Sequence, residues 1–191
     1  EEADRAVRGI LKQPAEITSV TKTKKQRKAK PPYTTSTMQQ DAVNRLNFGS
    51  KNTMTLSQML YEGIEIPGHG HVGLITYMRT DSTRISDEMI KQVRPYIERV
   101  YGKDYLPPKP NVYARGKDSQ DAHEAIRPTN LQFAPDMLAA VLSRDQLRLY
   151  TLIWNRFLAS QMAPQISQAT NAVLQSGIYT LRATGTQILF D

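Results

Sequence analysis

Apolar residues recur at helical spacing through the middle of the chain and alternate with polar residues near its C-terminal end. Three- and four-residue spacing predicts amphipathic helices, because such residues share one face of a helix with 3.6 residues per turn. On this pattern we expect helices over 1–11, 36–49, 52–62, 86–102, 135–142 and 143–161. The last helix has a broad apolar face that we expect in the core, made by Leu147, Tyr150, Trp154, Phe157 and Leu158.

Capping signals mark several of these boundaries. Ser36 with Gln39, and Ser143 with Gln146, each fit a capping box, in which two side chains satisfy the free N–H groups of the first turn. Gly49 fits the end of the first of these helices, because glycine readily adopts the conformation that ends a helix. Both helices are therefore predicted from local signals alone.

Pro95 interrupts the helix that is capped by Ser86. A proline inside a helix removes a hydrogen bond and costs roughly 3 kcal/mol, so we expect a kink or a boundary there. The inward stripes of the middle helices are expected at Leu56, Met59 and Leu60 and at Ile90, Val93, Ile97 and Val100.

Short apolar or alternating runs predict strands at three places. The stretch Ile17–Thr23 alternates weakly, Leu74–Thr76 is a short apolar run, and the residues after 164 alternate on both sides of a Ser176–Gly177 turn. The last pattern predicts a β-hairpin. Residues 64–72, rich in glycine and histidine, predict a turn-rich loop, and the three prolines within 102–120 predict irregular chain.

The net charge of +7 comes almost entirely from one segment. Residues 22–30 hold six of the 25 lysines and arginines and no acid, so the other 19 cations nearly balance the 18 acids. Such a run fits a solvated, mobile linker, an arm that contacts phosphates without reading base sequence, or both at once. Within it, Lys24, Lys25, Arg27 and Lys28 are our candidates for nucleic-acid contacts.

Composition excludes several classes of protein. No apolar run approaches about 18 residues, so we expect no transmembrane helix, and the first residues lack a signal-peptide pattern. The chain has no cysteine, which excludes disulfides and thiolate metal sites and fits a cytoplasmic protein. His69 and His71 alone provide too few ligands for a metal site.

Reactive side chains concentrate in the stretch Gly73–Arg84. Its short apolar run delivers Tyr77 into a polar segment, and Arg79 follows two residues later, on the same face of an extended chain. A phenol is a weak nucleophile, with a free pKa of about 10, and a nearby guanidinium favours the phenolate and grips phosphate. The pair indicates attack on a phosphate, although most tyrosines are packing residues and this chain has nine.

Three blocks of the sequence, in order, resemble the signatures of the bacterial type IA DNA topoisomerases. They are Thr35–Gln40, Gly73–Arg84 and Asp121–Thr129. Met78 stands where the topoisomerase III branch typically has proline, which favours the topoisomerase I branch. The resemblance implies an α+β fragment of a larger protein: a mostly helical, tyrosine-bearing domain at 33–158, with strands of a neighbouring arch domain at 1–32 and 159–191.

The resemblance also implies a reaction. Tyr77 would attack a backbone phosphorus and form a 5′-phosphotyrosine, and the freed 3′-hydroxyl would later reseal the strand, with no nucleotide cofactor. Strand passage through the break would relax negative supercoils. The residues implied as catalytic are Tyr77, Arg79 and His123, and those implied in nucleic-acid binding are Arg79, Arg127, Asp81 and Gln58. We expect Asp81 to orient a neighbour, since a bare carboxylate repels phosphate.

The implied cofactor lies outside this sequence. In the family, magnesium binds an acidic cluster of a Toprim domain, and no Asp-x-Asp-x-Glu pattern occurs here. We therefore expect no metal site in this chain, and weak or absent activity from the chain alone. The expected partners are single-stranded or negatively supercoiled DNA and the Toprim and neighbouring domains of the same protein, in the bacterial cytoplasm at the nucleoid and with no membrane.

Other functions stay open at this point. A basic α+β module could bind nucleic acid without chemistry, with Tyr77 as a packing residue. The chain could also be the topoisomerase part of a reverse gyrase, which would carry a helicase-like region elsewhere, or a scaffold domain that packs on a partner. A covalent adduct with DNA would distinguish the binding module from the topoisomerase.

Overall fold

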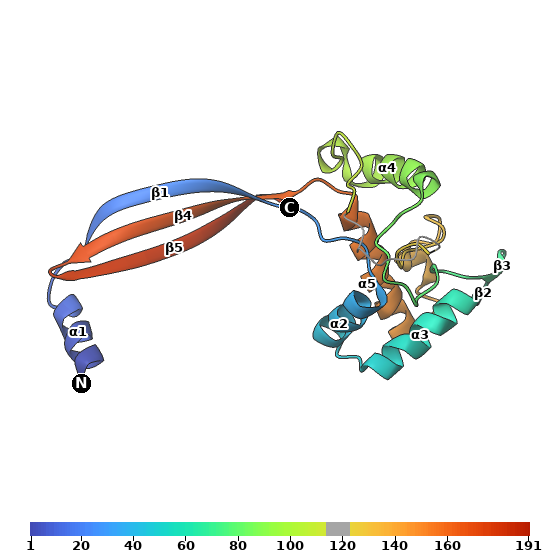
Figure 1. Cartoon of the computed structure of the whole chain (residues 1–191), viewed down its shortest axis with the longest axis horizontal. Helices are drawn as coiled ribbons and strands as arrows, with labels where there is room; N and C mark the ends of the chain where they lie inside the picture. The colour runs from blue at the N-terminus through green and yellow to red at the C-terminus, as the bar shows by residue number, and fades with distance from the viewer. Residues whose placement is uncertain (114–122) are drawn as a thin grey trace. The chain divides into compact units, whose positions relative to one another are not determined.

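The chain folds into two units in a computed structural model that describes residues 1–113 and 123–191 (Figure 1). One unit contains Ala29–Ala163, and the other combines Glu1–Lys28 with Pro164–Asp191. We expected the divisions after residues 32 and 158. No helix in the described part of the chain is long and apolar enough to span a membrane.

The unit made from the two chain ends combines a helix with a three-stranded antiparallel sheet. Its elements are α1 (Glu2–Leu11), β1 (Glu16–Arg27), β4 (Gln165–Ser176) and β5 (Tyr179–Phe190), in the sheet order β1-β4-β5. The predicted hairpin is confirmed, because Ser176 pairs with Tyr179 across a two-residue turn. Gly177 has a φ of +58° in that turn, a conformation that glycine adopts without strain.

The expectation of a mobile linker is wrong for residues 22–27 of the basic run. Its residues up to Arg27 lie in β1, which pairs with β4 along its length, for example at Lys24 with Gln168. We expected a strand over 17–23 only. The strand extends to Arg27 because β4 provides backbone partners up to that residue. β1 is a fully exposed edge strand, where water screens the repulsion between lysines and where charge discourages pairing with other chains.

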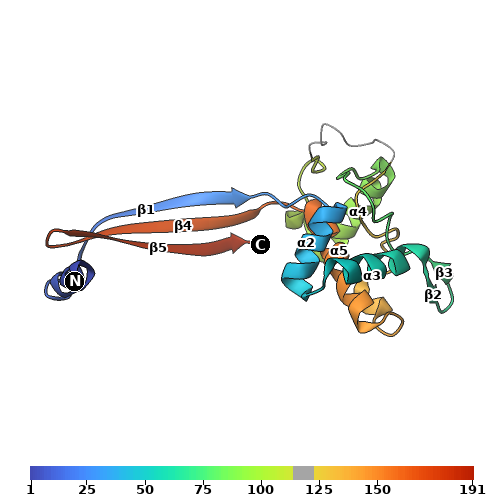
Figure 2. The same cartoon turned by 60° about the horizontal axis from the view of Figure 1, so that its bottom comes forward.

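The helical unit is built around α5 (Arg144–Ser160), whose central side chains are buried. It packs against α2 (Thr35–Leu46) and α3 (Ser50–Glu62), as Figures 1 and 2 show. The other elements of the unit are α4 (Asp87–Tyr101) and the short 3-10 helices η1 (Lys103–Tyr105) and η2 (Pro135–Leu138). The aromatic face predicted for α5 lies in the core, where Tyr150, Trp154, Phe157 and Leu158 are all at most 3% exposed.

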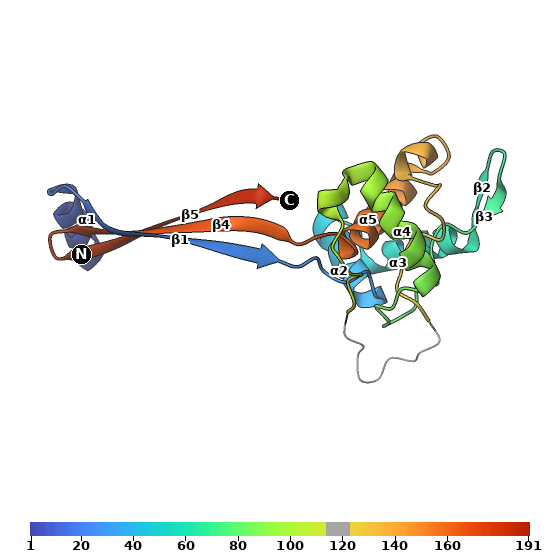
Figure 3. The same ribbon diagram turned by 90° about the horizontal axis from the view of Figure 1, so that it is seen from above.

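Residues 64–72, where we expected a turn-rich loop, contain the turn and also a short strand on each side of it. Strand β2 (Ile64–Ile66) pairs with β3 (Gly70–Val72), and the hairpin projects beyond the end of α3 (Figure 3). Gly68 and Gly70 both have positive φ, at +80° and +72°, which lets the chain reverse within a few residues. The turn residues were recognised, but the three-residue strands were too short to produce an alternating pattern.

The start of α2 differs from the predicted capping box at Ser36. Thr34 is the N-cap, and its side chain and that of Thr37 form the box. The helix begins earlier because the backbone N–H of Thr35 is already bound to the carbonyl of Thr80, at 2.9 Å. A contact with a distant segment therefore decides which of four neighbouring hydroxyl residues becomes the cap. The other predicted box, at Ser143 and Gln146, is confirmed.

The helix ends differ in a similar way. Asn47, with a φ of 60°, ends α2, whereas Gly49 is extended and precedes α3. Asparagine tolerates the left-handed conformation better than most residues, so glycine was not needed there. Met59 and Val100 are 45% and 50% exposed and were wrongly placed on inward faces.

Helix α4 continues through Pro95, so the alternative of a boundary there is wrong. Pro95 has no N–H to donate to the carbonyl of Lys91, one turn earlier in the helix. Both residues are exposed, so water can hydrate that carbonyl. The inner stripe of α4 is made by Met89, Val93 and Ile97, which are at most 4% exposed. Hydration thus lowers the free-energy cost of a proline inside the helix, and the helix continues through it.

Buried tyrosine hydroxyls link distant parts of the helical unit. Tyr33 donates to a carboxylate oxygen of Asp41 at 2.7 Å, Tyr150 to the carbonyl of Phe133 at 2.8 Å, and Tyr113 to the carbonyl of Ser160 at 2.7 Å. Burial raises the pKa of all three phenols, that of Tyr113 to about 12. Each phenol therefore stays protonated in the folded protein to a higher pH than a free phenol does.

Stability should fall in alkaline solution for this reason. The folded pKa of each phenol lies above the unfolded value of about 10, so its contribution is complete below pH 10 and is lost as the pH rises through the folded pKa, which is about 12 for Tyr113. We expect the urea midpoint to fall across this window, together with a cooperative rise in tyrosinate absorbance. The variant Tyr113→Phe should show a smaller fall, and a midpoint independent of pH up to 12 would contradict this account.

Candidate active site

The backbone that carries Tyr77 is extended and passes through the core of the helical unit. Ile75 forms one antiparallel bridge with Pro128, and the N–H of Thr76 donates to the carbonyl of Arg127 at 3.0 Å. The strand predicted over Leu74–Thr76 is therefore reduced to an isolated bridge. Pro128 has no N–H to donate, and a ladder cannot continue through it.

Hydroxyl side chains fix the residues on both sides of Tyr77. Thr76 donates to the carbonyl of Ala125 at 2.6 Å, and Thr35, from the first turn of α2, donates to the carbonyl of Met78 at 2.7 Å. Met78 is fully buried. The three segments with signature-like sequence thus meet around Tyr77. The Thr76 hydroxyl is used in a hydrogen bond to the backbone.

The segment also approaches the end of α3 closely. The N–H of Leu74 donates to the carbonyl of Leu60 at 2.7 Å. A side chain at Gly73 would place its Cβ 2.7 Å from the carbonyl oxygen of Tyr61, a clash with backbone. Glycine at this position therefore allows the tyrosine segment to lie against α3.

Two aromatic rings contact the Tyr77 ring. The centroid of the Tyr61 ring lies 5.3 Å away, with the planes at 63°, and that of the His123 ring lies 5.6 Å away, with the planes at 35°. Tyr77 is half-buried, whereas His123 is exposed. Edge and offset ring contacts of this kind favour a defined ring position. The phenol is thus held by its ring, with no hydrogen bond to its hydroxyl from any described residue.

Sequence reasoning missed Tyr61. It lies at the end of α3, three residues after Gln58 and on the same side of the helix. Its ring could have been suspected only from that spacing, because nothing local distinguishes it from the other tyrosines. Gln58 itself is half-buried and donates to the carboxylate of Glu62 at 2.6 Å.

Arg79 and Asp81 are exposed. Neither side chain makes an ion pair or a hydrogen bond with any residue that the structure describes, so the surface pairs of Arg79 with Asp81 or Glu88 that we considered are not formed there. Among the described residues, nothing therefore competes with a dissolved anion for the Arg79 guanidinium, two residues after Tyr77. Such an anion would gain a charge-assisted hydrogen bond without displacing a carboxylate.

Arg127 has a different environment. Its side chain is buried, its Nε donates to Oε2 of Glu124 at 2.7 Å, its Nη2 binds the same oxygen, and its Nη1 donates to the carbonyl of Pro128 at 2.8 Å. Arg84 approaches the other oxygen of Glu124 at 3.9 Å. The Arg127 donors thus hold the shape of the segment that follows His123, and its expected contact with DNA stays a prediction.

The remaining candidates lie elsewhere. Lys24, Lys25 and Arg27 are on β1, and Lys28 is the last residue before the helical unit. Asp121, at the start of the third signature-like block, lies outside the described residues. Within 1–113 and 123–191, no group of three or more acidic or histidine side chains could hold a metal ion, so the described residues do not fit a magnesium site.

Comparisons with known proteins show which family this chain resembles. A family model described as DNA topoisomerase matches residues 1–191. DNA topoisomerase 1 of Campylobacter jejuni is 51% identical over 162 residues, which are 84% of this chain and 23% of that protein. DNA topoisomerase 1 of Xylella fastidiosa is 44% identical over 189 residues, 98% of this chain and 23% of that protein.

A solved structure is similar over the same length. Full-length topoisomerase I from Thermotoga maritima superposes with a TM-score of 0.85 at 38% identity, covering 100% of this chain and 30% of that one. The chain thus spans less than a third of the length of each of these relatives. The greater part of each relative therefore has no counterpart in these 191 residues.

Proposed function

Because this chain belongs to the bacterial type IA DNA topoisomerase family, we propose that it supplies the nucleophile with which the whole protein cuts and reseals one DNA strand. The observation that carries the proposal is the setting of Tyr77. Its ring is held by Tyr61 and His123, and an arginine without a partner among the described residues lies two positions away. Relaxation of negative supercoils by strand passage belongs to the same proposal.

The proposed step exchanges one phosphodiester for another. The Tyr77 oxygen loses its proton and bonds to a backbone phosphorus, and the bond from phosphorus to the 3′-oxygen breaks. The 3′-oxygen takes up a proton and leaves as a hydroxyl, while the 5′ end stays on the tyrosine. Resealing is the reverse reaction, so bonds and charge balance without a nucleotide cofactor.

Arg79 and His123 have distinct roles in this proposal. Negative charge spreads over the phosphoryl oxygens as the new bond forms, and Arg79 would bind those oxygens. The absence of a carboxylate partner among the described residues supports this role. The His123 ring lies beside the Tyr77 ring, and an imidazole can donate a hydrogen bond to a phosphate or exchange a proton with a phenol.

The other candidates act less directly. Arg127 is a positioning residue, because its bonds to Glu124 and to the Pro128 carbonyl shape the segment that carries His123. Asp81 and Gln58 remain proposed contacts of the DNA path. We propose that the whole enzyme uses magnesium and that a Toprim domain, which is not among these 191 residues, would hold it. We place the protein with DNA in the bacterial cytoplasm.

The basic strand β1 is proposed to contact DNA phosphates. Lys25 and Arg27 are two positions apart in the strand, so their side chains lie on the same face of β1. All residues of β1 are exposed. Replacing both by alanine should reduce the slope of log affinity against log salt by about 1.4 for single-stranded DNA, at about 0.7 per lost phosphate contact. Fluorescence anisotropy of a labelled oligonucleotide at several salt concentrations measures the slope. The variant Lys12→Ala is the matched control, and an unchanged slope in the double variant would remove β1 from the interface.

The test of the function is covalent trapping with the full-length protein. Single-stranded DNA carrying a label would be incubated with protein and magnesium, then denatured and separated by size. We expect a labelled adduct in which the protein is attached to a 5′-phosphate. Binding without any adduct would favour the nucleic-acid-binding module. Supercoil changes that require ATP would favour the reverse gyrase alternative.

A further inference from the structure

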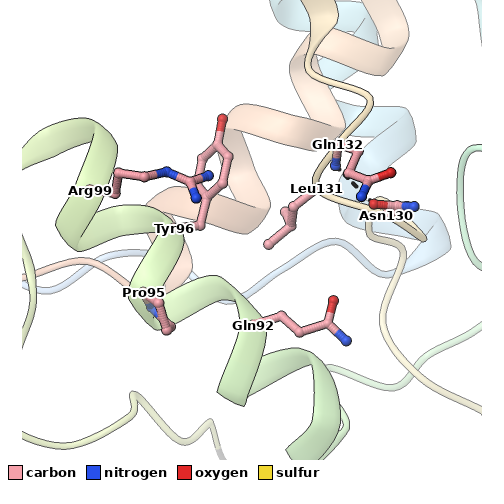
Figure 4. Close-up of a pocket in the computed structure, with 7 residues that line it drawn as sticks. All are labelled: Gln92, Pro95, Tyr96, Arg99, Asn130, Leu131 and Gln132. Atoms are coloured by element: carbon pink, nitrogen blue, oxygen red, sulfur yellow. Dashed lines mark hydrogen bonds between the residues drawn. The ribbon is translucent and has the colours of Figure 1, made fainter.

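A hollow in the helical unit lies between α4 and the segment 130–132, and it shares no lining residue with the Tyr77 cluster. Its volume is about 240 Å³, smaller than the roughly 300 Å³ at which pockets begin to enclose whole small molecules. Figure 4 shows the side chains around it. The lining residues are Gln92, Pro95, Tyr96, Arg99, Asn130, Leu131 and Gln132.

One wall of the hollow is a fixed aromatic surface. The Tyr96 ring stands edge-on to Trp154, with centroids 5.8 Å apart and planes at 81°, so its position is set by the core. The guanidinium carbon of Arg99 lies 5.5 Å from the centre of the same ring. Pro95 and the half-buried Leu131 add further apolar surface. Because the guanidinium lies over the ring, a flat ligand would meet a planar, cationic surface there.

The polar side chains of the hollow have unused hydrogen-bonding groups. Gln92, Arg99 and Gln132 are exposed, and their side chains make no hydrogen bond or ion pair within residues 1–113 and 123–191. Asn130 accepts from the N–H of Gln132 at 2.8 Å through its Oδ1, which leaves its amide NH₂ for a ligand. Figure 4 shows Gln92 and Leu131 directed into the gap between α4 and 130–132.

We propose that this hollow binds one nucleobase of single-stranded DNA, as a contact separate from the Tyr77 site. Side-chain amides both donate and accept, as base edges do, and the Tyr96–Arg99 pair provides stacking and a cation for the adjoining phosphate. The lining contains no acid that would repel DNA. The inference rests on the proposed function in one respect, that the protein acts on DNA.

Photocrosslinking tests the site directly. A single-stranded oligonucleotide with 5-iodouracil would be irradiated with the full-length protein, and the cross-linked peptides would be identified by mass spectrometry. We expect a crosslink within the α4 peptide that contains Tyr96. Crosslinks that map only to other elements would overturn the proposal.

A binding experiment separates a base contact from a charge contact. Removing the Gln92 amide or the Arg99 guanidinium should weaken binding of an ordinary oligonucleotide about 5- to 10-fold in each variant, Gln92→Ala and Arg99→Ala. With an oligonucleotide of abasic residues, Gln92→Ala should bind as the unmodified protein does. Lys91→Ala, on the same helix but outside the lining, controls for charge. Equal affinity of all variants, or an equal loss for the abasic oligonucleotide in Gln92→Ala, would contradict the proposal.

The two proposals fail in different ways. Adduct formation reports on Tyr77 and should persist in Gln92→Ala at saturating DNA, because Gln92 is not part of that cluster. Loss of the adduct in the unmodified protein would remove the proposed function while the crosslink could still be observed. An adduct with no α4 crosslink would remove only the nucleobase site.

Discussion

Replacing Tyr77 with phenylalanine is expected to abolish the covalent adduct with DNA in the full-length protein. The phenyl ring keeps the contacts with Tyr61 and His123 but has no oxygen to bond to phosphorus. We expect at least a roughly 10³-fold lower yield of adduct, since the substituted ring has no nucleophilic atom. The free energy of unfolding should change by less than about 0.5 kcal/mol, because no described residue hydrogen-bonds to the lost hydroxyl.

The adduct experiment has a matched control in the neighbouring ring. Tyr61→Phe removes a hydroxyl of the same kind from the same cluster and should still form the adduct. Its rate would show whether the Tyr61 hydroxyl has any role beyond the ring contact. An adduct that persists in Tyr77→Phe, with its phosphate mapped to another residue, would refute Tyr77 as the nucleophile.

Replacing Arg127 with alanine should lower the free energy of unfolding by about 3–5 kcal/mol. The change removes three hydrogen bonds and leaves the Glu124 carboxylate, in a largely buried position, with only Arg84 at 3.9 Å. Urea denaturation monitored by circular dichroism measures the effect. A residue that acted only as a DNA contact would leave this free energy unchanged.

Arg79→Ala is the matched control for that measurement. Arg79 is exposed, so its loss should change the free energy of unfolding by less than about 0.5 kcal/mol. Its effect should appear in the chemistry, as an adduct rate lower by about 10²–10³ at unchanged stability. Equal stability losses in Arg79→Ala and Arg127→Ala would show that burial does not distinguish the two arginines.

Local sequence was enough to predict the elements whose signals lie within one turn. The capping box of Ser143 and Gln146, the cap at Ser86 and the β4–β5 hairpin all depend on residues within a few positions of one another. The apolar face of α5 was predicted for the same reason, since its period is a property of the segment itself. The family was recognised from three blocks that could be read directly from the chain.

Other outcomes depended on partners distant in the sequence. The basic run became a strand because β4, some 140 residues later, pairs with it, and α2 starts at Thr35 because that residue binds Thr80. Pro95 stays within α4 because the affected face is exposed. These outcomes could not be predicted from local sequence, because each depends on contacts or burial that form only when the chain folds.

The candidate site divides in the same way. Residue identity and order established which side chains carry the proposed chemistry: Tyr77 as the phenol, Arg79 as the cation, and the segment with His123 as a further block. The folded structure established that Tyr61 adjoins the Tyr77 ring, that Arg79 is exposed with no side-chain partner in 1–113 or 123–191, and that Arg127 binds Glu124. Residue type determines which bonds a side chain can form, whereas burial and neighbouring groups determine whether its donors are available to a ligand.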